Sequence, residues 1–134
     1  MKKILILNAL VFGLPGSGKS TFAKKLATDK LAYFNADEIR KIYNDWDFTE
    51  LGRIRQAERM FALTGLAKGN CVVDFVCPYD KFRSDYDITV WMNTIKEGRF
   101  ADTNKLFQKP ITVDYEITDY NYDSIIKEIY DRLQ

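Results

Sequence analysis

Four residues near the start of the chain have the types and spacing of a phosphate-binding loop. Gly13, Gly18, Lys19 and Ser20 fit the pattern G-x-x-x-x-G-K-[ST], within the segment "GLPGSGKST" at residues 13–21. Glycines let backbone N–H groups turn toward an anion, the helix that follows presents its positive end, and the lysine adds a mobile charge. The Ser20 hydroxyl can bind a Mg²⁺ ion that bridges two phosphates. An apolar run precedes the loop and a helix-forming segment follows it, so we expect the loop to bind a nucleoside triphosphate. The residues expected to contact the nucleotide are Gly13, Pro15, Gly16, Ser17, Gly18, Lys19, Ser20 and Thr21.

Two carboxylates lie in or just after apolar segments and are candidates for accepting a proton or binding Mg²⁺ at the phosphates. Asp37 and Arg40 come just after an apolar run at 31–36, and their i, i+3 spacing lets them share one helix face. Asp37 can accept a hydroxyl proton, order Mg²⁺, or do both; the alternative is a helix-capping Asp paired with a surface Arg. Asp74 lies in a second apolar run, where an unpaired carboxylate is costly. We expect Asp74 to meet magnesium, the loop lysine or an arginine, with a hydrogen-bonded strand end as the alternative.

The basic residues are the candidates for holding an anionic substrate. Arg53, Arg55 and Arg59 in "GRIRQAERM" form a cationic helix, in which at least one arginine can pair with Glu50 or Glu58. The formal net charge of the chain is only +1, so the electric field of the whole protein does not attract nucleic acid or a membrane. Anion binding must therefore come from locally clustered Lys and Arg.

The composition excludes several kinds of chemistry. The chain of 134 residues predicts one domain, 1–134, and its lack of histidine excludes a His-based triad, a His general base and a His-containing zinc site. Cys71 and Cys77 would lie about 20 Å apart on one strand face, too far for a disulfide, so we expect both to be reduced. No segment approaches the length of a transmembrane helix, and we expect a cytoplasmic protein with no membrane partner.

Apolar runs and helical periodicities alternate along the chain. We expect strands at 4–12, 31–36, 71–78, 87–94 and 111–118, and helices at 20–30, 37–46, 49–68 and 122–133. Asp37 is expected to open its helix, Thr49 to cap the next one and Gly69 to end it, while residues 95–110 form a polar loop or short lid. This order predicts a three-layer α/β P-loop NTPase fold with a five-stranded, mostly parallel sheet flanked by helices. Ligands of such sheets lie beyond the carboxyl ends of the strands, where these motifs fall.

Two of the common classes of phosphate-loop proteins do not fit the sequence. A GTP-binding switch needs the guanine-reading N-K-x-D, and the nearest segment, "TNKLF" at 103–107, lacks the final aspartate. An ATPase motor would be larger and would carry an apolar strand ending in D-E, whereas Asp74 is followed by Phe75. The small size favours a kinase that acts on a small molecule or a nucleic acid. Besides the loop, such a kinase needs a carboxylate near the acceptor hydroxyl, cations that hold an anionic acceptor, and a lid that excludes water.

Four motifs in order resemble those of the adenylylsulfate kinases (APS kinases), which phosphorylate the 3′-hydroxyl of adenosine 5′-phosphosulfate with ATP. Residues 13–21 are close to that family's loop G-L-S/P-G-S-G-K-S-T, and "FNADEIR" at 34–40 resembles its L-D-G-D-N-V-R. "RIRQAERM" at 53–60 is similar to N-I-R-R-I-A-E, and "FVCPYDKFR" at 75–83 is similar to F-I-S-P-Y-R-x-x-R. The resemblance covers roughly residues 5–90.

The resemblance implies an ATP-dependent phosphotransferase with Mg²⁺ as its metal and a small anionic nucleotide as acceptor. By it, Lys19 and Asp37 are catalytic, and Ser20 and Asp37 lie at the magnesium ion. Three arginines hold the anionic groups of the acceptor, and two phenylalanines stack on its adenine. The residues that we expect around the acceptor are Arg40, Arg55, Asp74, Phe75, Pro78, Arg83, Lys105 and Phe107.

The sequence also departs from that family, and the departures leave the acceptor open. Asn35 replaces an aspartate, and the basic lid is much shorter, with Lys96, Arg99 and Lys105 as its cations. "FNADEIRK" also resembles the polynucleotide 5′-kinases, so a nucleic-acid end or a modified nucleotide is the second candidate acceptor. A nucleotide-binding module without phosphotransfer is a third hypothesis. The sequence leaves open whether the chain forms a homodimer.

Overall fold

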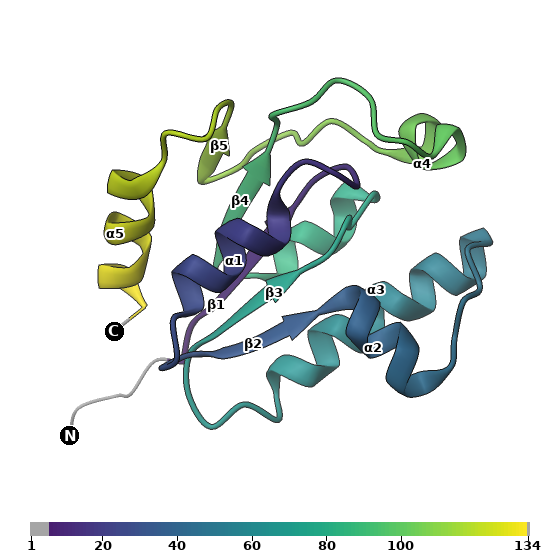
Figure 1. The fold of residues 1–134 in the computed structure, drawn as a ribbon. Coiled ribbons are helices and arrows are strands. Elements are labelled where there is room, and N and C mark those ends of the chain that lie inside the picture. Colours follow the sequence, from purple (N-terminus) through teal and green to yellow (C-terminus); the bar gives the residue numbers. More distant parts are fainter. Residues whose placement is uncertain (1–5, 134) are drawn as a thin grey trace.

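The computed structural model describes residues 6–133 and has the expected α/β sheet. The strands are β1 (Asn8–Phe12), β2 (Ala32–Asn35), β3 (Cys71–Asp74), β4 (Ile88–Met92) and β5 (Tyr115–Ile117). They lie in the order β2-β3-β1-β4-β5, and every neighbouring pair is parallel (Figure 1). The prediction of a five-stranded, mostly parallel sheet is confirmed. Residues 4 and 5 of the first predicted strand lie outside the described residues.

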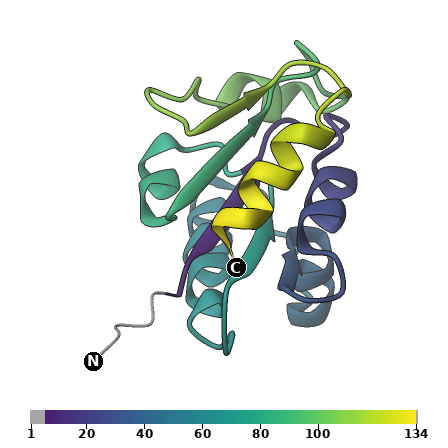
Figure 2. The ribbon, with the colours of Figure 1, turned by 90° about the vertical axis from the view of Figure 1, so that its left-hand side faces the viewer.

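Helices cover both faces of this sheet and complete the three predicted layers. Helices α1 (Lys19–Ala27) and α5 (Asp123–Arg132) pack on one face, while α2 (Ala36–Tyr43) and α3 (Glu50–Thr64) pack on the other. Figure 2 shows α5 crossing in front of the sheet, with α1 beside it. A short helix, α4 (Ala101–Leu106), lies at the carboxyl-terminal edge, near the loop that follows β1 (Figure 1).

The apolar run of β1 is explained by burial on both of its faces. Ala9 and Val11 belong to the core shared with α1 and α5, whereas Leu10 and Phe12 belong to the core shared with α2 and α3. All four side chains are fully buried. Because successive strand residues point to opposite faces, a central strand between two helical layers must be apolar throughout.

The strand order places the phosphate loop and Asp74 at the same edge of the sheet. The chain runs from β1 to β2 on one side of β1 and later to β4 on the other, which opens a crevice at the carboxyl ends of the strands. The parallel register pairs Asp74 of β3 with Val11 of β1 and with Asn35 of β2. The last residue of β3 is therefore flanked by the loop after β1 and by the end of β2.

The predicted helix ends are right at Thr49 and wrong at two other positions. The Thr49 side chain accepts a hydrogen bond from the Gly52 N–H and caps α3, as expected. Asn35, not Asp37, caps α2, because its side-chain oxygen accepts the Glu38 N–H at 3.1 Å and leaves Asp37 in the first helical turn. Helix α3 ends at Thr64 with Gly65 as its C-cap, rather than at Gly69, because the N–H groups of Leu66 and Ala67 bond to carbonyls three residues back instead of four.

Three predicted segments are shorter or more structured than the sequence indicates. The predicted strand 71–78 stops at Asp74, and Cys77 has a φ of 45°, which an extended strand does not allow. The predicted strand 111–118 is reduced to β5, with Ile111 exposed before it. The expected loop at 95–110 contains α4, and a 3₁₀ helix at Asp80–Asp85 was not predicted.

Between residues 6 and 133, no helix combines the length and the apolar character that crossing a bilayer requires.

Both cysteines are free and buried, although Cys77 lies beyond the end of β3 and not on one strand face with Cys71, and we expect both thiols to be unreactive in the native protein. Burial raises the pKa of the Cys71 thiol to about 11 and that of the Cys77 thiol to about 12, so almost no thiolate is present at pH 8. A colorimetric thiol assay with DTNB at pH 8 should find no fast-reacting group in the native chain and two after unfolding in guanidinium chloride. One rapidly modified thiol in native buffer would show that the 71–77 segment opens.

Candidate active site

The loop after β1 has the backbone geometry of a phosphate cradle. Gly18 lies at the N-terminus of α1 with a φ of 91°, and a Cβ atom at Gly13 would lie 2.7 Å from the Met92 carbonyl oxygen. Neither position accepts a side chain without strain. The Leu14 carbonyl accepts the Ser17 N–H at 3.1 Å and the Lys19 ammonium at 3.2 Å, which closes the turn. The first amides of α1 and Lys19 therefore lie together at this edge of the sheet.

A hydrogen-bond network joins the loop to the ends of β2 and β3. The Asp74 carboxylate oxygen Oδ2 accepts three hydrogen bonds, from Ser20 Oγ at 2.9 Å, Asn35 Nδ2 at 3.0 Å and Tyr33 OH at 2.6 Å. Burial and the bond to Asp74 raise the pKa of the Tyr33 phenol above its ordinary value, so Tyr33 remains a donor. Of the alternatives for Asp74, the hydrogen-bonded strand end is present. Its contact with magnesium stays a prediction.

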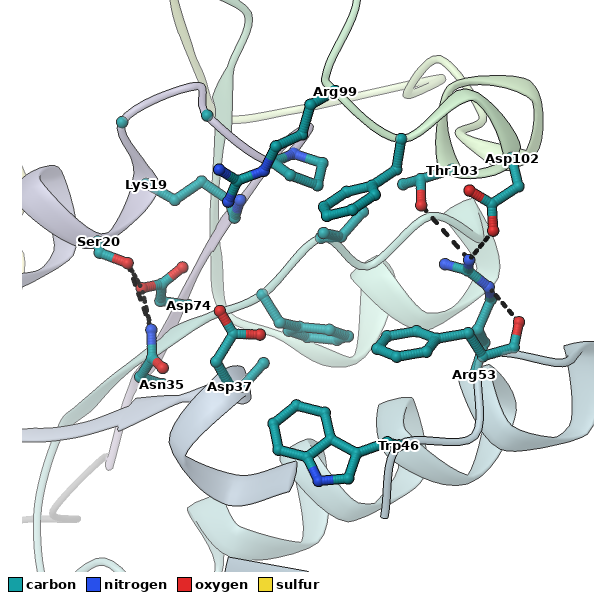
Figure 3. A pocket seen from close by; sticks show the side chains of 18 of the residues that line it. Lys19, Ser20, Asn35, Asp37, Trp46, Arg53, Asp74, Arg99, Asp102 and Thr103 are labelled. Atoms are coloured by element: carbon teal, nitrogen blue, oxygen red, sulfur yellow. Dashed lines mark hydrogen bonds and ion pairs between the residues drawn. The ribbon is translucent and has the colours of Figure 1, made fainter. Parts of the chain in front are cut away.

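Lys19 and Asp37 enter one cavity from different elements. Figure 3 shows the Asp37 carboxylate, from the first turn of α2, pointing into the space below Lys19 and Arg99. Burial lowers the pKa of the Lys19 ammonium, while the charges of Asp74 and Asp37 act in the opposite direction. The lysine is thus held close to two carboxylates, in a place where a bound anion would stabilise its charged form.

The cavity has a volume of about 820 Å³, which is within the range of small-molecule sites. Its phosphate-loop wall is formed by Pro15, Gly16, Gly18, Lys19, Ser20 and Thr21, with Arg99 beside Lys19, and its far wall by Trp46, Phe48, Arg53, Phe75, Phe100, Asp102 and Thr103. Of the eight residues predicted around the acceptor, Asp74 and Phe75 line this cavity, whereas Arg40, Arg55, Pro78, Arg83, Lys105 and Phe107 are not among its lining residues.

Two of the predicted acceptor arginines are bonded to the turn between α2 and α3. The buried Arg40 donates through Nη1 to the carbonyl oxygens of Asp45, at 2.9 Å, and Asp47, at 3.2 Å. Arg55 lies at the surface and pairs with the Asp45 carboxylate at 2.8 Å and that of Asp47 at 3.2 Å. Acceptor binding by Arg40 or Arg55 stays a prediction, and it would require these bonds to be exchanged.

The third predicted arginine is part of a buried stack behind the cavity. The Arg83 guanidinium carbon lies 4.3 Å from the ring centroid of Phe12 and 4.8 Å from that of Phe107. Arg83 also donates to the carbonyl oxygens of Cys77 and Pro78. These contacts give Arg83, Pro78 and Phe107 a shared packing role in this conformation, and their contact with the acceptor stays a prediction.

The far wall contains residues that the sequence did not identify as site residues. Trp46 and Phe48 come from the turn before α3, which lies so close to the helix that a Cβ atom at Gly52 would overlap the Asp47 carbonyl. The buried face of α3 includes the polar residue Arg53, while the apolar Leu51 is exposed. Apolar residues alone therefore do not define the buried face of α3, which also holds Arg53 and Gln56 beside Met60. The Thr49 cap followed by a glycine was the available signal for this tight turn.

The segment predicted as a lid lies against the phosphate loop. The Asn104 side chain accepts the Gly98 N–H at 2.8 Å and donates to the Gly98 carbonyl at 2.9 Å. A Cβ atom at Gly98 would lie 3.0 Å from the Pro15 carbonyl oxygen, so the backbone here approaches the loop closely. Arg99 and Phe100 reach the cavity from this segment. That residues 95–110 act as a lid stays a prediction.

The residues at this edge of the sheet fit a magnesium ion held mainly by phosphates. Among residues 6–133, no group of three or more His, Cys, Asp and Glu is placed to hold a metal ion. Mg²⁺ commonly keeps several waters and binds one or two carboxylates together with substrate phosphates. The Ser20 hydroxyl and the carboxylates of Asp37 and Asp74 line the same cavity and supply oxygen ligands of this kind.

Comparison with known proteins places this fold among those of the P-loop kinases. No family model matches the sequence, and no curated protein sequence matches it significantly. The structure is similar to that of the Mycobacterium tuberculosis APS kinase CysC in complex with AMPPNP and APS, with a TM-score of 0.75 and 21% identity, over 93% of this chain and 95% of that chain. The shikimate kinase from Acinetobacter baumannii in complex with shikimate gives a TM-score of 0.65 at 14% identity, over 95% of this chain and 92% of that chain. A gluconokinase from Sinorhizobium meliloti gives a TM-score of 0.59 at 15% identity, over 98% of this chain and 93% of that chain. At these identities the likeness is one of fold, and the chain has the three-layer α/β fold of APS kinase and other P-loop kinases.

Proposed function

We propose that this protein is an ATP-dependent kinase that transfers the γ-phosphoryl group to a hydroxyl of a small acceptor. The observation that carries the proposal is that Lys19 of the phosphate loop and Asp37 of α2 line one cavity. A phosphoryl group between these two residues would have a cation on its donor side and a proton acceptor on its acceptor side. These are the two groups that phosphoryl transfer to an alcohol requires besides the metal.

On the donor side, the loop amides and Lys19 would hold the β- and γ-phosphates. The glycine geometry leaves the backbone N–H groups at the N-terminus of α1 free to face an anion, where the helix dipole adds a partial positive charge. When bound, Mg²⁺ would neutralise the negative charge that the phosphates share. Ser20 and Asp37 are its expected ligands, and Asp74 orients the Ser20 hydroxyl through their 2.9 Å hydrogen bond.

On the acceptor side, Asp37 would orient the attacking hydroxyl and take its proton. The Asn35 cap fixes the start of α2 and with it the backbone position of Asp37, and the Asn35 Nδ2 also bonds Ser20 and Asp74. The carboxylate that would receive the proton is thereby linked through the backbone to the residues that would position the donor. Such fixed geometry between the reacting groups is a large part of catalysis in kinases.

We propose adenosine 5′-phosphosulfate as the first acceptor to test. The motif resemblance supports it, as does the similarity to the CysC fold. The far wall adds aromatic side chains, Trp46, Phe48, Phe75 and Phe100, which suit a flat ring, and the cation Arg53. A nucleic-acid end or a modified nucleotide is the second candidate. It is favoured by the roughly half-exposed rings of Trp46, Phe48 and Phe100, which a base at a chain end could stack on.

A coupled assay of ADP release would test these acceptors side by side. With ATP and Mg²⁺, we expect turnover with adenosine 5′-phosphosulfate and none with shikimate or gluconate. Turnover on an oligonucleotide with a 5′-hydroxyl, and none with the phosphosulfate, would instead support the second candidate. A nucleotide-binding module without phosphotransfer would bind ATP and release no ADP with any of these compounds.

Replacing Lys19 by alanine should abolish most of the activity and leave the fold intact. Lys19 supplies the mobile charge at the phosphates, and its only hydrogen bond among the described residues is to the Leu14 carbonyl. We expect the rate of ADP release to fall by about 100-fold or more, with a melting temperature close to that of the parent chain. Lys24→Ala, which removes an exposed lysine from the same helix, is the matched control. A Lys19→Ala enzyme with near-parental turnover would contradict the assignment.

Replacing Asp37 by asparagine should lower kcat much more than it changes the KM for ATP. The amide keeps the shape of the side chain and cannot accept the hydroxyl proton, so we expect kcat to fall by about 100- to 10,000-fold. Steady-state kinetics in ATP and acceptor separate the two effects. Glu38→Gln, at the next and exposed position of α2, controls for the loss of a negative charge. If the asparagine variant retains the parental kcat, another group takes the proton.

A further inference from the structure

Tyr33 is a residue of β2 whose phenol reaches the end of the neighbouring strand β3. Its OH donates to Asp74 Oδ2 at 2.6 Å, which is the shortest of the three hydrogen bonds to this oxygen. A hydroxyl that donates to a carboxylate at this distance makes a charge-assisted bond, which is stronger than a bond between two neutral groups. Burial and this bond raise the pKa of the Tyr33 phenol, so the phenol keeps the proton that it donates. Tyr33 thus supplies a buried charge with its shortest contact.

Packing fixes the direction from which Tyr33 approaches this carboxylate. The parallel register pairs Tyr33 with Val72 and Asn35 with Asp74. Alternate residues of a strand share a face, so all four side chains lie on the face of the sheet that α1 and α5 cover, where Val72 is buried in the core. The Tyr33 ring packs against the same core. A phenylalanine at position 33 would therefore keep the ring contacts and remove only the hydroxyl.

Lys19 makes no ion pair, although two carboxylates act on its charge. Burial lowers the pKa of the Lys19 ammonium, while the charge of Asp74 and, to a smaller extent, that of Asp37 raise it. Among residues 6–133, neither carboxylate is close enough to form an ion pair with the ammonium, whose hydrogen bond goes to the Leu14 carbonyl. The attraction between a lysine and a buried carboxylate is strong where water is scarce. A competing interaction must therefore hold the Asp74 carboxylate.

We propose that Tyr33 is a positioning residue that keeps Asp74 bound to the neutral donors of β2 and α1, so that Lys19 stays unpaired for the phosphates of the nucleotide. A carboxylate paired with Lys19 would have to be displaced before the lysine could bind a phosphate, and this cost would weaken nucleotide binding. Figure 3 shows the Asp74 carboxylate between Ser20 and Asn35, with Lys19 above them. The proposal rests on the nucleotide-binding part of the proposed function and is independent of the acceptor.

The variant Tyr33→Phe tests the proposal through nucleotide affinity, without any turnover. Isothermal titration calorimetry with a non-hydrolysable ATP analogue gives the Kd in the presence of Mg²⁺ and, in EDTA, in its absence. We expect Tyr33→Phe to bind the analogue about fivefold more weakly than the parent chain under both conditions, because the effect arises at the lysine and not at the metal.

Tyr115→Phe is the matched control for the loss of a phenol. The Tyr115 ring packs against the same core from the strand at the opposite edge of the sheet, and its OH bonds to Glu128 at 3.2 Å. This variant removes a hydroxyl that bonds to a carboxylate but does not lie at the phosphate loop. We expect it to bind the analogue with the Kd of the parent chain.

A double-mutant cycle with Lys19→Ala separates positioning from a general loss of structure. In a Lys19→Ala background no lysine remains for Asp74 to pair with, so adding Tyr33→Phe should change the Kd by less than about twofold. Damage to the loop or to the sheet would instead weaken binding equally in both backgrounds. Thermal melting confirms that each variant is folded.

Equal Kd values for the parent and Tyr33→Phe would overturn the proposal, as would an equal loss of affinity in the Lys19→Ala background. A loss confined to the Mg²⁺-loaded analogue would also overturn it, because Tyr33 would then act through Ser20 and the metal. If the parent chain bound no analogue, both this proposal and the proposed function would be wrong. Failure of the proposed phosphotransfer alone differs from these outcomes, since the analogue would bind and no acceptor would give ADP release.

Discussion

The arrangement of the site depends on the three hydrogen bonds that converge on one oxygen of Asp74. A carboxylate that is 1% exposed would be very costly without partners. Its donors come from two other parts of the chain, Ser20 at the start of α1 and the side chains of Tyr33 and Asn35 on β2. Because Asn35 also caps α2, this network fixes where the helix that carries Asp37 begins. A single buried charge thus relates the phosphate loop to the proposed acceptor carboxylate.

The sequence predicted the sheet and the glycine-rich loop because their signals are local. The run in β1 must be apolar on both faces, the glycines of the loop occupy positions that exclude a side chain, and Thr49 caps the helix that it precedes. Each of these constraints acts within a few residues. The cap of α2 shows the limit of this approach. Asn and Asp are both favourable N-cap residues, so the sequence alone does not choose between Asn35 and Asp37. Asn35, which caps the helix, also donates a hydrogen bond to Asp74, 39 residues away in the sequence.

The far wall of the cavity could not be predicted in the same way, because its composition depends on which partner each arginine binds. Arg40, Arg53 and Arg55 are near one another in the sequence and equal in chemical type. The turn between α2 and α3 supplies carbonyls and carboxylates that engage Arg40 and Arg55. Arg53 also donates to this turn, at the Phe48 carbonyl oxygen, but its side chain lines the cavity. Tertiary contacts, rather than motif spacing, made this selection.

The two halves of the cavity are held by interactions of different strength, and this difference bears on how such a fold serves different acceptors. The phosphate-loop side is fixed by hydrogen bonds whose loss would leave a buried charge unpaired. The far wall is closed by exposed side chains of a short segment, in which Asp102 pairs with a buried arginine across the gap. An exposed residue there can be changed with little effect on the core. A fold with this division can keep its phosphate loop while the opposite wall changes, which is consistent with one fold being shared by proteins that carry the names of APS kinase, shikimate kinase and gluconokinase.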